Sequence, residues 1–208
     1  MKYLYLALIW SAWCFLHSAL ISLRVKRYLK ERLQDRFRYF RIAYNGIALF
    51  TLIPVVLYAY ALQTHPLFVW QGYLRVPQFF LLCLSISLFV SGARRYDALA
   101  FLGVRQMKES NSCLGLTEDC TLDTSGVLGL VRHPWYAGGL VILWARGLDV
   151  SAIITNLILS GYLILGAFQE ERKLSIEFPG AYREYQEKVS MFFPWKWLKS
   201  SLIHRLYR

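Results

Sequence analysis

The chain is poor in the residues that bind metals or form disulfide bridges. Its 208 residues include four cysteines and four histidines. No two cysteines form a CxxC pair, and no Cys/His spacing matches a metal site. Two cysteines fall in apolar runs and two in a polar segment, where reduced thiols are the default (Cys14, Cys83, Cys113 and Cys120). We therefore expect neither a metal centre nor a disulfide framework.

The sequence also lacks internal repeats and low-complexity linkers. Paired halves with broken helices, which are typical of transporters, are not evident. A length of 208 residues suits one domain. We expect this domain, 1–208, to contain three membrane helices in 1–93. A polar loop, a helical hairpin and an amphipathic tail would then follow in 94–208.

Acidic residues are scarce, and the basic residues are unevenly distributed. The chain has 24 Lys and Arg against 13 Asp and Glu, a net charge of +11. Eight of the basic residues lie in 24–41, one in 63–75 and five in 94–132. Because these segments alternate with apolar runs, the pattern indicates membrane topology rather than nucleic-acid binding. It predicts an N-terminus outside, and cytoplasmic 24–41, 94–132 and C-terminus.

Long apolar runs dominate the rest of the chain. The sequence is 56% hydrophobic, and its mean hydropathy is +0.35. Five runs approach the roughly 20 residues that span a bilayer core: 3–23, 42–62, 76–93, 134–147 and 150–169. The first has no small-residue cleavage site after it, so we interpret it as a retained anchor. The fold class is therefore predicted as all-α, a polytopic integral membrane protein with about five transmembrane helices.

The two last runs predict a helical hairpin. Residues 134–147 would rise only about 21 Å as a helix, and residues 145–150, "ARGLDV", suit a turn. A hairpin that leaves and regains the cytoplasmic side would return Glu170 and Glu171 to the neighbourhood of Arg132 and His133. A cytoplasm-facing site is expected at that corner.

The residue types at this corner suit one kind of ligand. Pro134 fits the first position of a helix, whose N-terminus attracts anions. Arg132 adds a cation, Trp135 and Tyr136 offer aromatic faces, and Glu170 can accept hydrogen bonds. S-adenosylmethionine has a carboxylate, an ammonium, a diol and a base to match them. Each residue alone has a plainer interpretation, such as a charged anchor for Arg132 or a solvated helix face for Glu170.

Two motifs carry a resemblance to a known family. "TLDTSGVLGLVRHPWYAGG" and "QEERKLSIEFPGAYREYQEKVSMFFPW" resemble the membrane-embedded S-adenosylmethionine-dependent methyltransferases, typified by isoprenylcysteine carboxyl methyltransferase and phospholipid methyltransferases. The match covers residues 115 to 195. "FLHSAL", "YFRIAYNGIALF" and "FLGVRQ" are similar to the branch of NnrU-like proteins and methanethiol S-methyltransferases.

The resemblance implies a set of cofactor-binding residues in a loop, a box and a helix end: Cys120, Thr121, Leu122, Asp123, His133, Pro134, Trp135, Tyr136 and Glu170. The prenylcysteine enzymes place an Arg four residues before this Glu, where it meets the substrate carboxylate. Here that position is Gly166. This difference disfavours a prenylcysteine acceptor.

These features predict a methyltransferase that transfers the sulfonium methyl to a small apolar thiol. A prenylcysteine carboxylate or lipid acceptor, and a non-catalytic NnrU-like accessory protein, are the alternatives. Arg105 and Arg132 are the candidate catalytic cations, although Arg105 could equally be a solvated loop residue. His17-Ser18, polar residues inside a span, mark either a site or a helix-to-helix hydrogen bond. Membrane lipids are expected partners, in a bacterial inner membrane.

Overall fold

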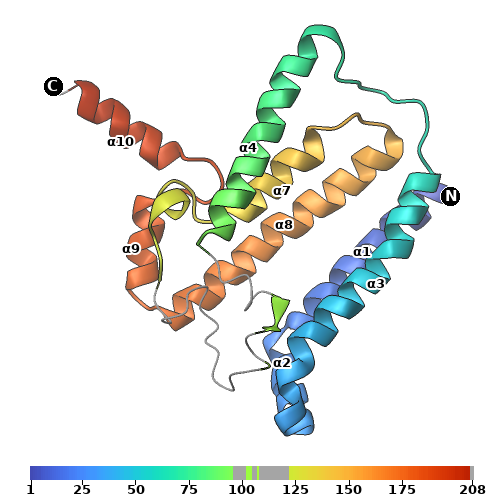
Figure 1. Ribbon diagram of the computed structural model, residues 1–208, viewed down its shortest axis with the longest axis vertical. Helices are drawn as coiled ribbons and strands as arrows, with labels where there is room; N and C mark the ends of the chain where they lie inside the picture. The colour runs from blue at the N-terminus through green and yellow to red at the C-terminus, as the bar shows by residue number, and fades with distance from the viewer. Residues whose placement is uncertain (96–101, 105–106, 108–121, 207–208) are drawn as a thin grey trace. The chain divides into compact units, whose positions relative to one another are not determined.

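The computed structural model describes residues 1–95, 102–104, 107 and 122–206. All regular structure in these ranges is helical, apart from two isolated bridges. The helices are α1 (Lys2–Ile21), α2 (Leu23–Leu33), η1 (Gln34–Tyr39), α3 (Phe40–Ala61), η2 (Gly72–Leu74), α4 (Arg75–Ala93), η3 (Gly126–Gly129), α7 (Pro134–Trp144), α8 (Val150–Glu177), α9 (Ala181–Lys188) and α10 (Trp195–Leu206) (Figure 1). The predicted all-α class is confirmed.

Four helical segments of the described chain are long and apolar enough to cross a membrane: Lys2–Ile21, Arg24–Ala61, Gly72–Ala93 and Val150–Glu177. The expected run 134–147 is not among them, because α7 has only 11 residues and rises about 16 Å, well short of the bilayer core. The expectation of about five spanning helices is therefore one too many for these residues. The predicted hairpin of 134–147 and 150–169 is present as α7 and α8.

The chain divides into two compact units. The first comprises Met1–Val69, Ala98–Ser112 and Gly147–Tyr162, and the second comprises Trp70–Asp97, Cys113–Arg146 and Leu163–Arg208. Helix α8 is continuous, so its first part belongs to the first unit and its last part to the second.

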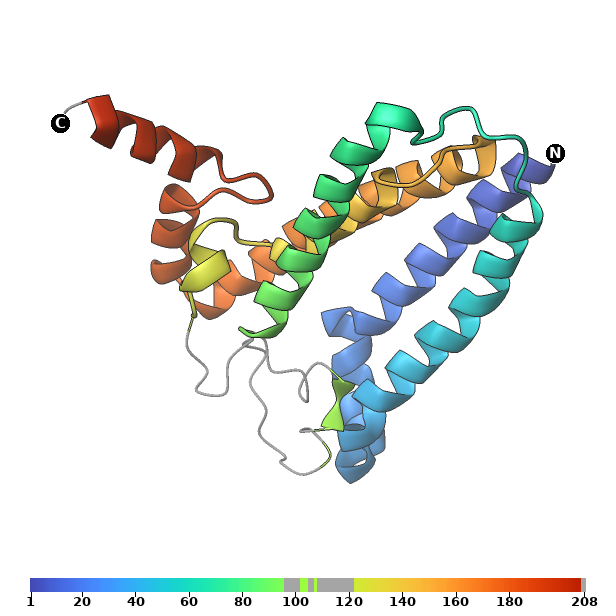
Figure 2. The same cartoon turned by 45° about the horizontal axis from the view of Figure 1, so that its top comes forward.

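In the first unit, α1 and α3 run side by side (Figures 1 and 2). Their contact buries Leu6 and Trp10 against Val55, with partly buried side chains of α8 around them. Asp149 fixes the start of α8, because one carboxylate oxygen accepts from the Ala152 N–H at 2.7 Å. The other accepts from the Thr64 N–H at 2.7 Å. This carboxylate therefore caps α8 and fastens the loop after α3.

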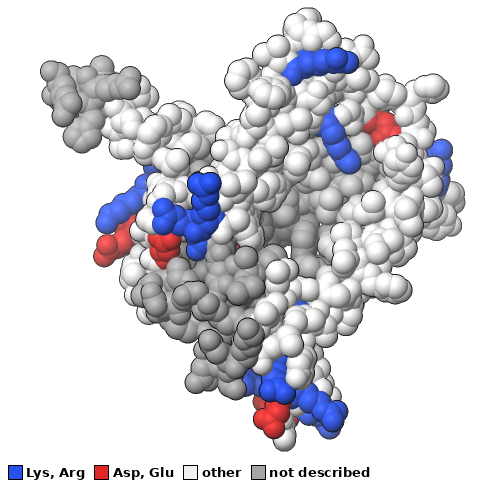
Figure 3. Space-filling model, in the orientation of Figure 1, with Lys and Arg blue, Asp and Glu red and all other residues white. Residues whose placement is uncertain are grey.

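The outward sides of the long helices are apolar. Large side chains such as Phe15, Phe50 and Leu57 are exposed on α1 and α3, and the view in Figure 3 shows broad surfaces without charged groups. Exposed apolar area of this extent is what a lipid environment covers. The surface thus agrees with the membrane assignment made from composition.

In the second unit, α4 packs along α7 through small residues (Figures 1 and 2). A Cβ at Gly92 would lie 2.5 Å from Cδ1 and Nε1 of the Trp135 side chain. The Trp135 indole N–H donates to the Phe89 carbonyl at 3.0 Å, and the Ser85 hydroxyl donates to the Gly138 carbonyl at 2.9 Å. Close approach of this kind is the usual way that apolar helices associate in lipid.

We predict that Gly92→Ala destabilises the second unit by about 1–3 kcal/mol, since the new methyl group must displace the Trp135 ring. Thermal unfolding of the protein in lipid nanodiscs would measure this change. Gly46→Ala is the matched control, because nothing lies within 4 Å of a Cβ there and alanine favours a helix. Equal stabilities of the two variants would contradict the packing argument.

Candidate functional site

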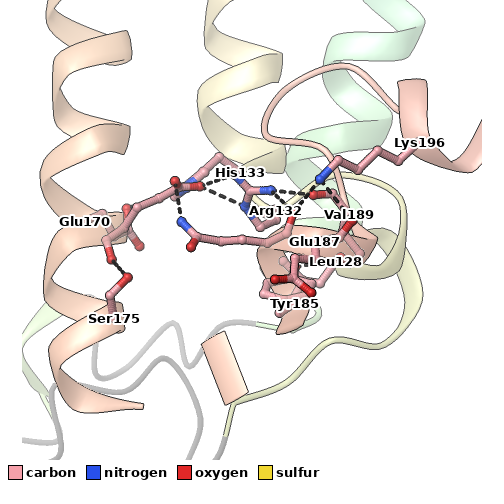
Figure 4. Close-up of polar contacts among 11 residues, drawn as sticks. Leu128, Arg132, His133, Glu170, Ser175, Tyr185, Glu187, Val189 and Lys196 are labelled. Atoms are coloured by element: carbon pink, nitrogen blue, oxygen red, sulfur yellow. Dashed lines mark hydrogen bonds and ion pairs between the residues drawn. The ribbon is translucent and has the colours of Figure 1, made fainter. Parts of the chain in front are cut away.

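The site is built where α7 begins. Val131 pairs with Ser190 in a parallel bridge, and the Arg132 and His133 N–H groups donate to the Ser190 and Met191 carbonyls at 2.9 and 3.1 Å. His133 is the N-cap of α7, and Pro134 takes its first position as predicted. The segment after α9 therefore holds residues 132–136 at the start of α7, which we call the polar box (Figure 4).

Arg132 is the most heavily bonded side chain of this box. Its Nε and Nη2 lie 2.7 and 2.6 Å from Oε1 of Glu171. Its Nη1 donates to the carbonyls of Gln186 and Val189. Only 9% of the Arg132 side chain and 11% of the Glu171 side chain are exposed. The guanidinium thus joins the start of α7 to α8 and to the end of α9.

Glu171 gathers a second set of donors. The Gln186 side-chain amide donates to its Oε2 at 2.9 Å, and Nε2 of His133 lies 3.3 Å from its Oε1. A buried carboxylate is stable when its lone pairs are satisfied in this way. The Glu171 side chain therefore orders both Arg132 and His133.

His133 lies between the two neighbouring glutamates. Its Nδ1 is 3.8 Å from Oε2 of Glu170, and its ring meets the Tyr136 ring edge to face at 5.4 Å between centroids. His133 is 3% exposed, whereas 27% of the Glu170 side chain remains accessible. Glu170 is thus the carboxylate of the pair that a ligand can reach.

Helix α9, in the C-terminal part of the chain, packs beside the site. Tyr182 and Tyr185 pack with Leu174 and Val189 in a small core, against which Leu122 rests. The Tyr185 hydroxyl donates to the Leu128 carbonyl at 2.6 Å. Burial raises the pKa of the Tyr185 phenol well above its ordinary value, while the charge of Arg132 opposes that shift. Tyr185 therefore stays a neutral donor.

Of the four predicted loop residues, the structure describes two. Leu122 contacts the α9 core. Asp123 accepts from the Ser125 N–H at 2.8 Å and the Ser125 hydroxyl at 2.6 Å, and Arg95 lies 3.8 Å from its other oxygen. Burial alone would raise the pKa of Asp123, but these bonds and the Arg95 charge lower it. Cys120, Thr121 and Arg105 lie outside the described residues.

The two aromatic residues of the box contact different helices. Trp135 packs against α4 and donates to the Phe89 carbonyl, as described above. Tyr136 packs against α8, and its Cε1 lies 3.2 Å from the position of a Cβ at Gly166. The structure therefore brings together Arg132, His133, Tyr136 and Glu170, while the Trp135 indole takes part in packing against α4.

The sequence places Glu171 at this corner but assigns it no role, and it gives no indication of Gln186. The signal for Glu171 was present, because a buried arginine at a helix start needs a carboxylate partner. The rotation of α8, which decides whether residue 170 or 171 meets Arg132, was not available from spacing. Nothing in the sequence distinguished Gln186 from an ordinary surface glutamine.

Comparison with known proteins finds relatives that share part of this chain. It is 36% identical over 67 residues to methanethiol S-methyltransferase 1 of Bradyrhizobium diazoefficiens, which covers 32% of this chain and 24% of that protein. It is 36% identical over 67 residues to methanethiol S-methyltransferase of a Pseudomonas species, covering 31% and 25%. The Mycobacterium tuberculosis protein of that name is 35% identical over 66 residues, covering 31% and 27%.

The chain spans about a quarter of the length of the curated relatives it matches. No family model matches the chain, and no solved structure matches it. Among the described residues, no group of three or more His, Cys, Asp or Glu could hold a metal ion.

We expect Glu171→Ala to destabilise the protein by about 3–5 kcal/mol, since it leaves the Arg132 guanidinium buried without its counter-charge. Chemical unfolding in detergent, followed by tryptophan fluorescence, would report the change. The matched control is Glu184→Ala, whose side chain is 73% exposed and pairs with Lys188 at the surface; such a pair contributes roughly 0.5 kcal/mol. A Glu171→Ala protein as stable as the control would show that the ion pair is not structural.

Proposed function

We propose that the protein is an S-adenosylmethionine-dependent membrane methyltransferase that methylates a small apolar thiol. The observation that carries the proposal is the contact of His133 with Glu170 and Glu171. It joins the two motifs that the family resemblance identified, although they are far apart in the sequence. The similarity to proteins named methanethiol S-methyltransferase supports the reaction type and the acceptor.

The residues at the α7 start fit the proposed cofactor. The accessible Glu170 carboxylate suits the hydroxyls or the ammonium of S-adenosylmethionine. The positive end of α7 favours a carboxylate, and the Tyr136 ring offers an aromatic face beside His133. When bound, the cofactor would supply a methyl group on a positively charged sulfur. His133, Pro134, Tyr136 and Glu170 are the described residues that we assign to holding it.

The environment of Gly166 supports a thiol rather than a carboxylate acceptor. Tyr136 packs where a side chain at residue 166 would begin. The arginine that the prenylcysteine enzymes place at this position therefore has no counterpart here. The stretch "LGAFQEE" also offers no other cation before Glu170. A neutral or thiolate acceptor needs no such partner.

Arg132 acts in this proposal as a positioning residue. Its guanidinium is fully engaged by Glu171 and the carbonyls of Gln186 and Val189. Methyl transfer by in-line displacement depends chiefly on holding the two reactants in register. By fixing the start of α7, Arg132 fixes His133 and Tyr136. Arg105, outside the described residues, stays a candidate cation for the acceptor.

The same proposal includes a topology. The distribution of basic residues places the N-terminus outside a bacterial inner membrane, with the C-terminus and the site in the cytoplasm. Helix α10 carries exposed Trp195 and Trp197 beside Lys196, a composition typical of a membrane interface. Membrane lipids and a small acceptor are the partners that this arrangement requires.

Calorimetry with nanodisc-embedded protein tests the cofactor site. Wild type is expected to bind S-adenosylmethionine, and Glu170→Ala is expected to weaken the affinity about 10–100-fold, because it removes a charged hydrogen-bond acceptor. Glu177→Ala, on the same helix, serves as the control and should bind as wild type does. Absence of binding to well-folded wild type would reject the methyltransferase proposal and favour an accessory protein.

A further inference from the structure

Two polar features of the first unit are not used by the proposed function. One lies inside its helices, where the Tyr44 hydroxyl of α3 is 2.6 Å from Nε2 and 3.0 Å from Nδ1 of His17 on α1. The His17 ring also stacks on Trp13 and meets Tyr162 edge on, with 5.1 and 5.9 Å between ring centroids. We call these four residues the His17 cluster. It contains the helix-to-helix hydrogen bond expected from the sequence, so helix packing accounts for it.

The second feature is the basic segment that joins α1 to α3. Both helices belong to segments that are long and apolar enough to cross a membrane, and residues 23–39 between them form α2 and η1. Ser22 separates α1 from α2, because its backbone is extended at φ −62° and ψ 149°. Its hydroxyl oxygen accepts from the Val25 N–H at 3.4 Å. A new helix therefore begins where the first apolar span ends.

The segment carries an excess of positive charge. Residues 23–39 contain seven Lys or Arg against Glu31 and Asp35, a net charge of +5. Arg24, Arg27 and Lys30 are exposed, and no carboxylate of the described chain lies within ion-pair distance of them. Basic side chains gather at the end of the unit where Figure 1 places α2 (Figure 3). These three charges are therefore open to an anion from outside the protein.

Helix α2 has an apolar face and a basic face. Val25 and Leu29, one turn apart, are half-buried. Arg24, Arg27 and Lys30 follow one another at intervals of three and lie on the opposite face. An amphipathic helix of this composition is typical of the boundary between lipid and water.

Exposed tyrosines accompany the basic residues. The Arg32 guanidinium lies over the Tyr28 ring at 5.7 Å, and the Arg38 guanidinium lies over the Tyr39 ring at 4.9 Å. Both rings are exposed, as is Leu33 at the end of α2. Tyrosine is enriched at membrane–water interfaces because its ring is apolar and its hydroxyl is polar. The segment thus offers apolar and cationic contacts side by side.

We propose that α2 binds the phosphate groups of anionic phospholipids through Arg24, Arg27 and Lys30. From Arg24 to Lys30 the helix axis rises only about 9 Å. The headgroup layer outside the hydrocarbon core is roughly 5–8 Å thick, so these long side chains reach it when α2 stands upright and when it lies flat. Basic clusters next to a membrane span bind anionic lipids in this way.

The surroundings of the three cations favour a lipid over other anionic partners. An acidic protein or a nucleic acid would also match the charge. Neither would account for the exposed Tyr28 and Leu33 beside it, or for a segment whose two ends join membrane spans. A phospholipid matches both features, because its phosphate lies directly above its acyl chains.

Native mass spectrometry of the protein in dodecyl maltoside measures the affinity for lipids. The protein is titrated with dioleoyl phosphatidylglycerol, which is anionic, and with dioleoyl phosphatidylcholine, which is zwitterionic and has the same acyl chains. The test variant combines Arg24→Gln, Arg27→Gln and Lys30→Gln. Glutamine forms helices about as well as Lys and Arg do, so α2 is preserved while its charge is removed.

The matched control removes the same charge from the second unit. It combines Arg94→Gln, Arg183→Gln and Lys188→Gln, all at exposed positions. Hydrogen exchange in phosphatidylcholine nanodiscs, with and without added phosphatidylglycerol, then locates the effect along the chain.

We expect wild type and the control to bind phosphatidylglycerol at least tenfold more tightly than phosphatidylcholine. The α2 variant should lose this preference to within about twofold, since each basic residue near an anionic surface contributes roughly fivefold. In wild type and the control, added phosphatidylglycerol should slow exchange of the α2 amides about tenfold, because a bound lipid opposes local unfolding. The α2 variant should show no such change.

Equal affinity of wild type for the two lipids would overturn the inference and make an acidic protein or a nucleic acid the partner to test. An equal loss of preference in the control would also overturn it, because net charge rather than α2 would then decide. Slower exchange confined to other helices would contradict the assignment to α2. None of these measurements requires methyl transfer, so the inference and the proposed function stand or fail separately.

Discussion

The ion pair between Arg132 and Glu171 is the interaction on which the rest of the candidate site depends. It joins residues 39 positions apart in the sequence and adds the carbonyls at the end of α9 to the same guanidinium. Both charges are withdrawn from water, so each needs the other to remain buried. His133 and Glu170 are adjacent to these two residues, and their contact follows from the pair.

Small residues decide how closely the helices around that ion pair approach. Gly92 and Gly138 bring α4 against α7. In the hairpin, Gly139 lies against Leu163, and Gly166 lies against Tyr136. Apolar helices gain little from burying apolar area in lipid, so such close packing supplies much of their association. The position of the Tyr136 ring at the site is a direct consequence.

Two groups of polar side chains stand out beside the long apolar helices that the structure describes. The α7 corner combines charges that suit a zwitterionic cofactor, whereas the His17 cluster has a single imidazole among aromatic rings. The first group is held together by ion pairs, and the second by a hydrogen bond and by ring contacts.

The sequence by itself determined the helical class, the spanning segments apart from α7, the hairpin and the position of the polar box. These follow from local patterns: apolar length, a proline at a helix start and the spacing of charges. Tertiary structure decided that Glu171 rather than Glu170 pairs with Arg132, that Trp135 packs against α4, and that His17 meets Tyr44. Such choices depend on how each helix is rotated about its axis and on how near its neighbours lie. Side-chain packing between distant segments fixes both, and no local pattern records them.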